Sequence, residues 1–340
     1  MIIKSRAPLR IGLAGGGTDV SPYSDLYGGS ILNATINKYA YATIEPLERN
    51  QIILNSIDKK VTLNYPIDDN LPIDGNLDLL KGVYNRIIKQ FKKKPQAFKL
   101  TTFVDAPAGS GLGSSSTLVV AIIGAFAEWL FLPLGEYDIA HLAFEIERID
   151  LGMHGGKQDQ YAATFGGFNF MEFYKDDKVI VNPLRIKQKY IAELQYNLVL
   201  FYTGTSRDSG AIIKQQSKNI VSKDENAVNA THVLKEQSIK MKEALLTGNL
   251  ENIGNILNLS WENKKQMAQG ISNPTIENLY KSAIAAGSNG GKISGAGGGG
   301  YIFFFCPANT RFNVIEEMKK FNVVAENYEF TSSGLYTYTI

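Results

Sequence analysis

Cysteine is almost absent from this 340-residue chain: Cys306 is the only one, so no disulfide can form within it. A surplus of charge is lacking too, because 35 lysine and arginine residues face 33 aspartate and glutamate residues, which leaves a net charge of +2. Such a balanced chain gives no field that would attract nucleic acid or an anionic membrane. The three histidines, His141, His154 and His232, lack the spacing of metal ligands.

Long hydrophobic runs are also scarce. The most apolar stretch, 118–132, is interrupted by Glu128 and is shorter than the ~20 residues that span a bilayer, so we expect a buried helix there. The first six residues lack the apolar stretch of a signal peptide. We therefore expect a cytoplasmic protein, a monomer or homodimer, whose partners are small molecules rather than nucleic acids or membranes.

Glycine, in contrast, is abundant, and it is concentrated in three segments, 7–19, 107–116 and 292–300. Glycine allows backbone conformations with φ > 0 and lets several N–H groups converge on one anion. The middle segment also carries a cluster of hydroxyl groups. Three such loops in one chain predict an enzyme that binds a nucleoside triphosphate.

Hydrophobic periodicity predicts a mixed α+β fold in two domains, 1–185 and 186–340. Alternating residues predict short strands up to about residue 65. Later strands are expected over 97–104, 198–203, 301–306 and 335–339, and helices over 78–91, 115–130, 136–149, 226–246, 250–267 and 275–286. The helix that follows the middle glycine loop would direct its N–H groups and positive dipole end at phosphates. Its serines at 114–116 would also suit a helix N-cap.

The middle segment fits the pattern P-x-x-x-G-L-G-S-S at 107–115, and the three segments occur in the order found in GHMP kinases. The chain therefore resembles this family, named for galactokinase, homoserine kinase, mevalonate kinase and phosphomevalonate kinase. The resemblance implies a ribosomal protein S5 domain 2-like N-terminal domain, a ferredoxin-like C-terminal domain, and the use of ATP and Mg²⁺. It assigns nucleotide binding to Pro107, Ala108, Gly109, Ser110, Gly111, Leu112, Gly113, Ser114, Ser115 and Ser116.

The same resemblance assigns the catalytic roles. Asp159 falls where the family has its active-site aspartate, which would orient and deprotonate the acceptor hydroxyl, and Arg10 takes the position of the basic residue beside it. Ser115 and Glu147 match the magnesium ligands. Glu147 precedes Asp159 by twelve residues, about one more than in mevalonate kinase, so the nearby Glu145 and Asp150 are alternatives.

The first segment resembles one branch of the family. Its Gly-Gly-Gly-Thr-Asp stretch, residues 15–19, is similar to that of D-glycero-D-manno-heptose 7-phosphate kinases, which phosphorylate the anomeric hydroxyl on the way to GDP-heptose for surface polysaccharide. L-fucokinases carry a similar stretch, usually in a much longer chain. An L-fucokinase-like enzyme is therefore an alternative, and a non-catalytic sugar- and ATP-binding regulator is another.

The candidate substrate contacts lie in the first glycine segment and near Asp159. We expect the sugar hydroxyls at Gly16, Gly17, Thr18, Asp19 and Gly156. A distal phosphate would need a cation, for which Lys157, Arg207 and Lys4 are candidates, and His154 is the histidine nearest the Asp159 loop. The third segment contributes Gly295, Gly297 and Gly298, either to the site or to a tight turn against the phosphate loop; Lys292 beside them could be a surface cation.

Overall fold

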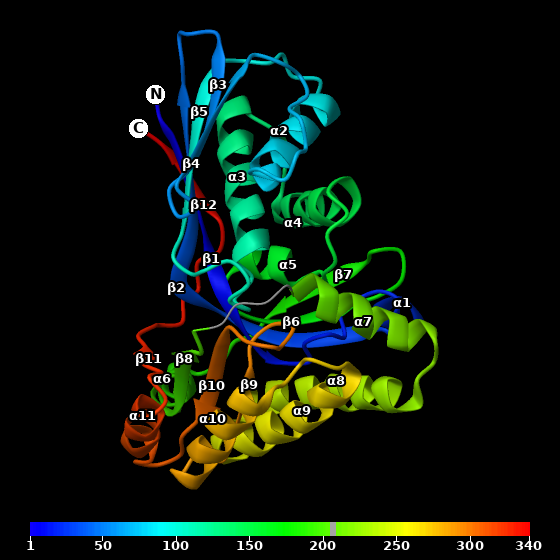
Figure 1. Cartoon of the computed structure of the whole chain (residues 1–340), viewed down its shortest axis with the longest axis vertical. Helices are drawn as coiled ribbons and strands as arrows, with labels where there is room; N and C mark the ends of the chain where they lie inside the picture. The colour runs from blue at the N-terminus through cyan, green and yellow to red at the C-terminus, as the bar shows by residue number, and fades with distance from the viewer. Residues whose placement is uncertain (205–208) are drawn as a thin grey trace.

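The computed structural model describes residues 1–204 and 209–340, which form two β-sheets (Figure 1). The first sheet has the spatial order β12-β1-β2-β5-β3-β4, and β6 and β7 extend it from β2. Its pairs are antiparallel except β3 with β5. The strands are β1 (Ile3–Ala14), β2 (Gly29–Pro46), β3 (Gln51–Ser56), β4 (Val61–Pro66), β5 (Phe98–Val104), β6 (Phe168–Phe173), β7 (Val179–Pro183) and β12 (Tyr336–Thr339).

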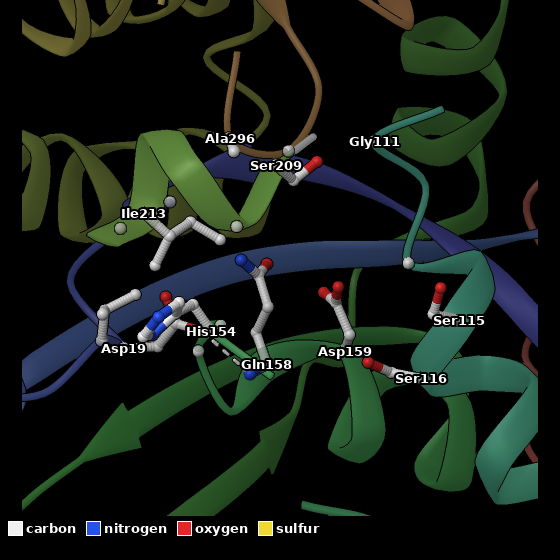
Figure 2. A pocket seen from close by; sticks show the side chains of 18 of the residues that line it. Asp19, Gly111, Ser115, Ser116, His154, Gln158, Asp159, Ser209, Ile213 and Ala296 are labelled. Carbon is white, nitrogen blue, oxygen red and sulfur yellow. Dashed lines mark hydrogen bonds between the residues drawn. The ribbon is translucent and has the colours of Figure 1, made fainter. Parts of the chain in front are cut away.

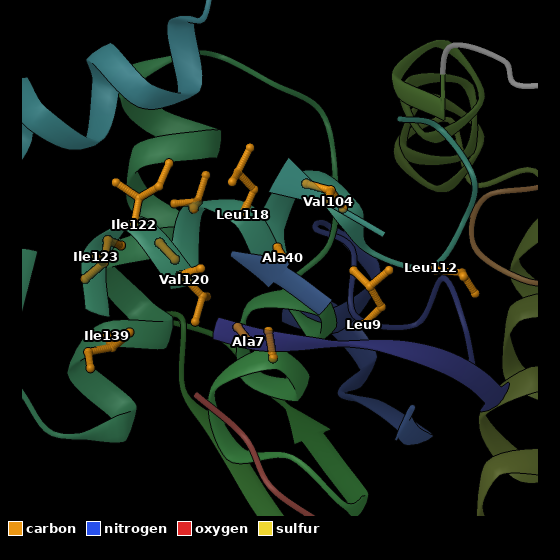
Figure 3. Close-up of a cluster of buried hydrophobic side chains, with 14 of the residues drawn as sticks. Ala7, Leu9, Ala40, Val104, Leu112, Leu118, Val120, Ile122, Ile123 and Ile139 are labelled. Carbon is orange, nitrogen blue, oxygen red and sulfur yellow. The ribbon is translucent and has the colours of Figure 1, made fainter. Parts of the chain in front are cut away.

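Helices cover one face of this sheet. They are α2 (Asp78–Gln90), α3 (Ser114–Leu130), α4 (Glu136–Glu145) and α5 (Gln158–Phe165). Figure 3 shows Leu118 and Ile122 of α3 among side chains of β1 and β2, including Leu9 and Ala40. Because α3 lies between the sheet and the other helices, it is apolar on nearly all sides, and the predicted buried helix is confirmed.

The second sheet has the order β11-β8-β10-β9, and its central strand explains an apolar run in the sequence. Tyr301, Phe303 and Phe305 of β10 face the core shared with the first sheet, whereas Ile302 and Phe304 face a second core. Successive side chains of a strand point to opposite faces of the sheet, so both faces of β10 are buried. The strands are β8 (Leu198–Tyr202), β9 (Gly290–Ile293), β10 (Tyr301–Phe305) and β11 (Ala325–Glu326).

The remaining helices pack partly with the second sheet and partly with β1 and β2 of the first. They are α1 (Tyr23–Tyr27), α6 (Gln188–Asn197), α7 (Ser209–Val221), α8 (Glu225–Thr247), α9 (Ile253–Met267), α10 (Pro274–Ala285) and α11 (Arg311–Lys319). Most predicted helices agree with these bounds to within one or two residues. The helix predicted over 136–149 does not, because α4 ends at Glu145 and a π-helical turn, Ile146–Asp150, follows it.

The two ends of the chain lie side by side (Figure 1). β12 pairs with β1, and the Ile2 amide donates to the Ile340 carbonyl oxygen at 2.8 Å. Leu335, just before β12, packs against Gly124 of α3. The predicted C-terminal domain, 186–340, thus gives its last strand to the first sheet. Within residues 1–204 and 209–340, no helix combines the length and apolar character needed to cross a membrane.

Candidate active site

The three glycine-rich segments meet around a cavity of about 680 Å³, a size typical of small-molecule sites. One wall comes from the loop after β1, the loop before α3 and the start of α5; the other comes from α7, α9 and the loop between β9 and β10. Figure 2 shows a row of side chains that runs from Ser115 through Asp159 and Gln158 to Asp19, with Ile213 of α7 opposite. The cavity is therefore elongated, with a serine-rich end and an Asp19 end.

The loop before α3, residues 107–113, rests on the third glycine segment. Gly111 has a φ of 84°, in the left-handed region that glycine favours, and a Cβ there would overlap the Ser294 carbonyl oxygen. The Tyr301 amide donates to the Ser110 carbonyl oxygen at 2.9 Å. The third segment therefore supports the loop, in agreement with the hypothesis that it forms a tight turn against the loop.

The residues predicted to bind nucleotide occupy different positions. Pro107 and Ala108 are exposed outside the cavity, and Ser110 and Leu112 are buried beneath it. The cavity itself is lined by Gly109, Gly111, Gly113, Ser114, Ser115 and Ser116.

Helix α3 begins at Ser114 without a side-chain cap. Gly113 occupies the N-cap position with a φ of 80°, and no side chain bonds to the first turn. The expectation that the serines cap this helix is therefore wrong, because the left-handed glycine already ends the loop. The first N–H groups and the positive end of the helix dipole remain available to a phosphate at the cavity wall that Ser115 lines.

Arg10 holds the carboxylate of Asp159. Its Nε donates to Asp159 Oδ1 at 2.7 Å, and its Nη2 lies 2.5 Å from the same oxygen. Its Nη1 donates to the Gly111 carbonyl oxygen at 2.6 Å. Among the described residues Asp159 Oδ2 has no hydrogen-bond partner. Arg10 therefore fixes the carboxylate through Oδ1, and Oδ2 can accept a hydrogen bond or a proton from a ligand hydroxyl group. Asp159 does not cap a helix: it lies in the first turn of α5, whose N-cap residue is Lys157.

Glu147 lies in the π-helical turn, fully buried but at the cavity wall. Its Oε2 accepts from Gln160 Nε2 at 2.5 Å, and the same amide donates to Ser116 Oγ at 3.2 Å. In the described part of the chain Oε1 has no hydrogen-bond partner, although Arg148 Nη1 lies 3.8 Å away. Burial raises the pKa of Glu147, and the Arg148 charge opposes that rise.

The two alternative carboxylates are used elsewhere. Arg86 of α2 lies 3.6 Å from Glu145 Oε2 and donates from Nε to Asp150 Oδ2 at 2.6 Å. Neither carboxylate lines the cavity. Glu147, in contrast, lines the cavity from the π-helical turn.

Asp19 is buried at the other end of the cavity, where it caps α5 from a distant part of the chain. Its Oδ2 accepts from the backbone amides of Lys157 and Gln158 at 2.8 and 3.0 Å. Burial raises the pKa of Asp19, and these amide hydrogen bonds oppose the rise. A Cβ on Gly156 would overlap the carboxylate, so glycine is required there. The first glycine segment therefore positions the helix that carries Asp159.

Thr18, expected to contact the sugar, has a structural position instead. Its hydroxyl is buried, donates to the Ser30 carbonyl oxygen at 2.9 Å and accepts from the Ser30 amide at 3.0 Å. Both hydrogen-bonding directions are used, so we do not retain Thr18 as a sugar contact. Gly16 and Gly17 do line the cavity.

Two of the cations expected to bind a distal phosphate, Lys157 and Lys4, do not line the cavity. Lys157 is buried against Asp177, with 2.7 Å between Nζ and Oδ1. Lys4 lies on β1 where that strand pairs with β12. Arg207 lies outside the described residues. His154, in contrast, lines the cavity beside Asp19 (Figure 2).

In the third segment, Gly295 lines the cavity, whereas Gly297 and Gly298 pack against the chain just before α10. Lys292 is not a surface cation: its side chain is buried, and its Nζ donates to the Gly12 carbonyl oxygen at 3.0 Å. Burial, with nearby positive charges, lowers its pKa well below the usual range.

The sequence prediction missed several cavity residues, among them Lys264 and Gln158. Lys264 stands in an ordinary amphipathic helix next to a second lysine, and Gln158 directly precedes Asp159. Neither has a local pattern that distinguishes it from a surface residue, because the contact between the two halves of the chain determines which side chains face the cavity.

Comparisons with known proteins agree with this geometry. Residues 78–167 match the model of the GHMP kinases N terminal domain, and residues 241–324 match that of GHMP kinases C terminal. Over 338 residues the chain is 48% identical to D-glycero-alpha-D-manno-heptose 7-phosphate kinase of Campylobacter jejuni, with 99% of each chain covered.

Two further relatives bear on the substrate. A crystal structure of a D-glycero-D-manno-heptose 1-phosphate kinase from Bacteroides thetaiotaomicron matches with a TM-score of 0.85 at 45% identity, covering 99% of both chains. The L-fucokinase/L-fucose-1-P guanylyltransferase of Bacteroides fragilis is 27% identical over 328 residues, which are 89% of this chain and 34% of that relative.

Gly113→Val should abolish nucleotide binding. A Cβ at this position would lie 3.1 Å from Asp159 Cγ, and the φ of 80° disfavours a β-branched residue. Isothermal titration with a non-hydrolysable ATP analogue measures the loss. Gly75→Val is the matched control, since Gly75 has a φ of 93° and nothing within 4 Å of its Cβ position. Unchanged affinity in the Gly113 variant would contradict the assignment of this loop.

Proposed function

We propose that this chain, which belongs to the GHMP kinase family and is an ATP-dependent sugar kinase, phosphorylates the anomeric hydroxyl of D-glycero-D-manno-heptose 7-phosphate. The family resemblance and the fold class expected from the sequence are confirmed. The observation that carries the proposal is the placement of Asp159, paired with Arg10, between the serine-rich end and the Asp19 end of the cavity. The product would enter the synthesis of GDP-heptose and surface polysaccharide.

In this proposal the serine-rich end binds the triphosphate of ATP. The glycine loop 107–113 and the uncapped start of α3 supply N–H donors, and in-line placement of the acceptor does much of the catalytic work. Asp159 would receive the hydrogen bond of the acceptor hydroxyl at Oδ2 and take its proton, while Arg10 keeps the carboxylate oriented. The acceptor sugar would lie toward Asp19.

Magnesium fits the residues at the serine-rich end. Glu147 Oε1 is a buried carboxylate oxygen without a hydrogen-bond partner in the described part of the chain, and Ser115 lines the same cavity. Oxygen ligands of this kind suit Mg²⁺, which when bound would neutralise charge on the phosphates. We propose Glu147 and Ser115 as its ligands, with Gln160 holding the carboxylate through Oε2.

A phosphate on the acceptor needs a cation at the far end of the cavity. Lys214 of α7 lines the cavity and is exposed, and no carboxylate pairs with it among the described residues. A charged amine on this wall could form charge-assisted hydrogen bonds with a phosphate. Lys214 therefore replaces Lys157 and Lys4 as our candidate for the distal phosphate.

The names of the two heptose kinase relatives place the existing phosphate on different carbons, so the test must identify the position of transfer. We expect turnover of heptose 7-phosphate and a product with two phosphorus signals, one coupled to the anomeric proton, in ³¹P nuclear magnetic resonance. The free heptose, heptose 1-phosphate and L-fucose are the comparison substrates. Preferred turnover of L-fucose, or transfer to heptose 1-phosphate, would overturn the proposal.

Asp159→Asn should lower turnover by roughly 10²-fold or more, the usual scale for loss of a positioned base. ATP affinity should stay near that of the wild type, because the amide keeps the shape of the side chain. Turnover of the variant within a few-fold of wild type would show that Asp159 is structural. If the wild-type chain itself were inactive on all the sugars, it would be a regulator rather than a kinase.

Ser115→Ala should raise the Mg²⁺ concentration that gives half-maximal activity and lower turnover. Since no side chain caps α3, the melting temperature should barely change. Ser116→Ala is the matched control: Ser116 also lines the cavity, but it is buried and its hydroxyl accepts a hydrogen bond from Gln160. A larger shift in Mg²⁺ dependence for Ser116→Ala would reverse the two assignments.

A further inference from the structure

Lys264 is a buried lysine that reaches the Asp19 end of the cavity from α9. Its side chain is 2% exposed, and its Nζ donates to the Gly16 carbonyl oxygen at 3.3 Å. An ammonium has three donors, yet within the described residues no other acceptor bonds to it and no carboxylate forms an ion pair with it. Burying a charge without such partners is costly, so a structural role alone does not explain this lysine.

Charged groups from three elements face Lys264. Asp19 lies after β1, Arg10 on β1 and Lys292 on β9. Burial lowers the pKa of Lys264 to about 8; the Asp19 charge opposes this shift and the Arg10 charge adds to it. A ligand oxygen beside the amine would favour its protonated form.

Gln158 supplies an unused acceptor in the same part of the cavity. The residue is 9% exposed, and its Oε1 has no hydrogen-bond partner among the described residues. Figure 2 shows the side chain standing between Asp159 and His154 and extending into the cavity. A buried amide oxygen left without a partner is unfavourable, and a ligand hydroxyl at this place would satisfy it.

We propose that Gln158 and Lys264 bind the hydroxyl groups of the acceptor sugar and so determine its specificity. Gln158, next to Asp159, accepts a hydrogen bond from the hydroxyl group on the carbon beside the reacting one. Lys264 donates a hydrogen bond to a hydroxyl group on a more distant carbon of the sugar. This inference rests on the proposed function, because it takes the acceptor to be a polyhydroxylated sugar. An acceptor that lacks one of these hydroxyls leaves a buried polar group unpaired and is rejected.

Lys264→Met tests the inference through steady-state kinetics of the full chain, with whichever acceptor the wild type turns over best. We expect the acceptor KM to rise about 10- to 100-fold, the scale of a lost hydrogen bond to a charged group, while the KM for ATP stays within about twofold. Lys265→Met is the matched control, since Lys265 follows it on α9 but pairs with Glu262 and Glu277 outside the cavity. It should leave both constants unchanged.

The pH dependence gives a second readout. Lys264 is charged below its pKa, so the wild-type acceptor KM should rise as the pH passes upward through about 8. The Lys264→Met variant should lack this rise. An acceptor KM within twofold of wild type, with a lower melting temperature, would show that Lys264 only supports the glycine loop and would overturn the inference.

Gln158→Leu keeps the inference testable if Lys264→Met fails to fold. We expect it to raise the acceptor KM and to reduce the discrimination between the sugar and its 2-deoxy analogue; unchanged discrimination would contradict the role of Gln158. Failure of the proposed function is a separate outcome. Wild-type activity on a sugar other than the heptose phosphate would refute that function, and the same variants assayed on that sugar would still test the inference.

Discussion

One buried guanidinium connects all three glycine segments. Arg10 belongs to the first, donates to the Gly111 carbonyl oxygen of the second and to Ser294 Oγ of the third at 3.4 Å, and also holds Asp159. Its planar fork of donors makes such a junction possible, which a lysine could not reproduce. The position of the Asp159 carboxylate thus depends on the same contacts that shape the loop 107–113, and both ends of the cavity depend on this one side chain.

The Asp19 end of the cavity depends on a second long-range contact. Asp19 caps α5 through the amides of Lys157 and Gln158, so the segment that lines this end also fixes the helix that carries Asp159. Loss of this carboxylate would leave buried N–H groups unpaired as well as removing a cavity side chain. A substitution of Asp19 would therefore change the surface of the cavity and the position of α5 together.

Local patterns predicted much of this molecule. The buried helix α3, the long helices of the second half and the central strand β10 follow from apolar periodicity, and the glycine loops mark the cavity. The π-helical turn and helices α1, α5, α6, α7 and α11 were missed, because segments with weak apolar periodicity form helices only through tertiary contacts. Thr18 and Lys157 were misplaced because the sequence indicates which residues lie near a site but not the direction in which a side chain points.

The pairing of β12 with β1 has a consequence for synthesis of the chain. All the other strands lie between β1 and β12 in the sequence, so during synthesis β1 emerges long before its outer neighbour. Until β12 has been made, this edge of the first sheet therefore exposes unpaired backbone groups, which can recruit strands of other chains. Pairing of β12 with β1 closes the edge and removes that risk of aggregation.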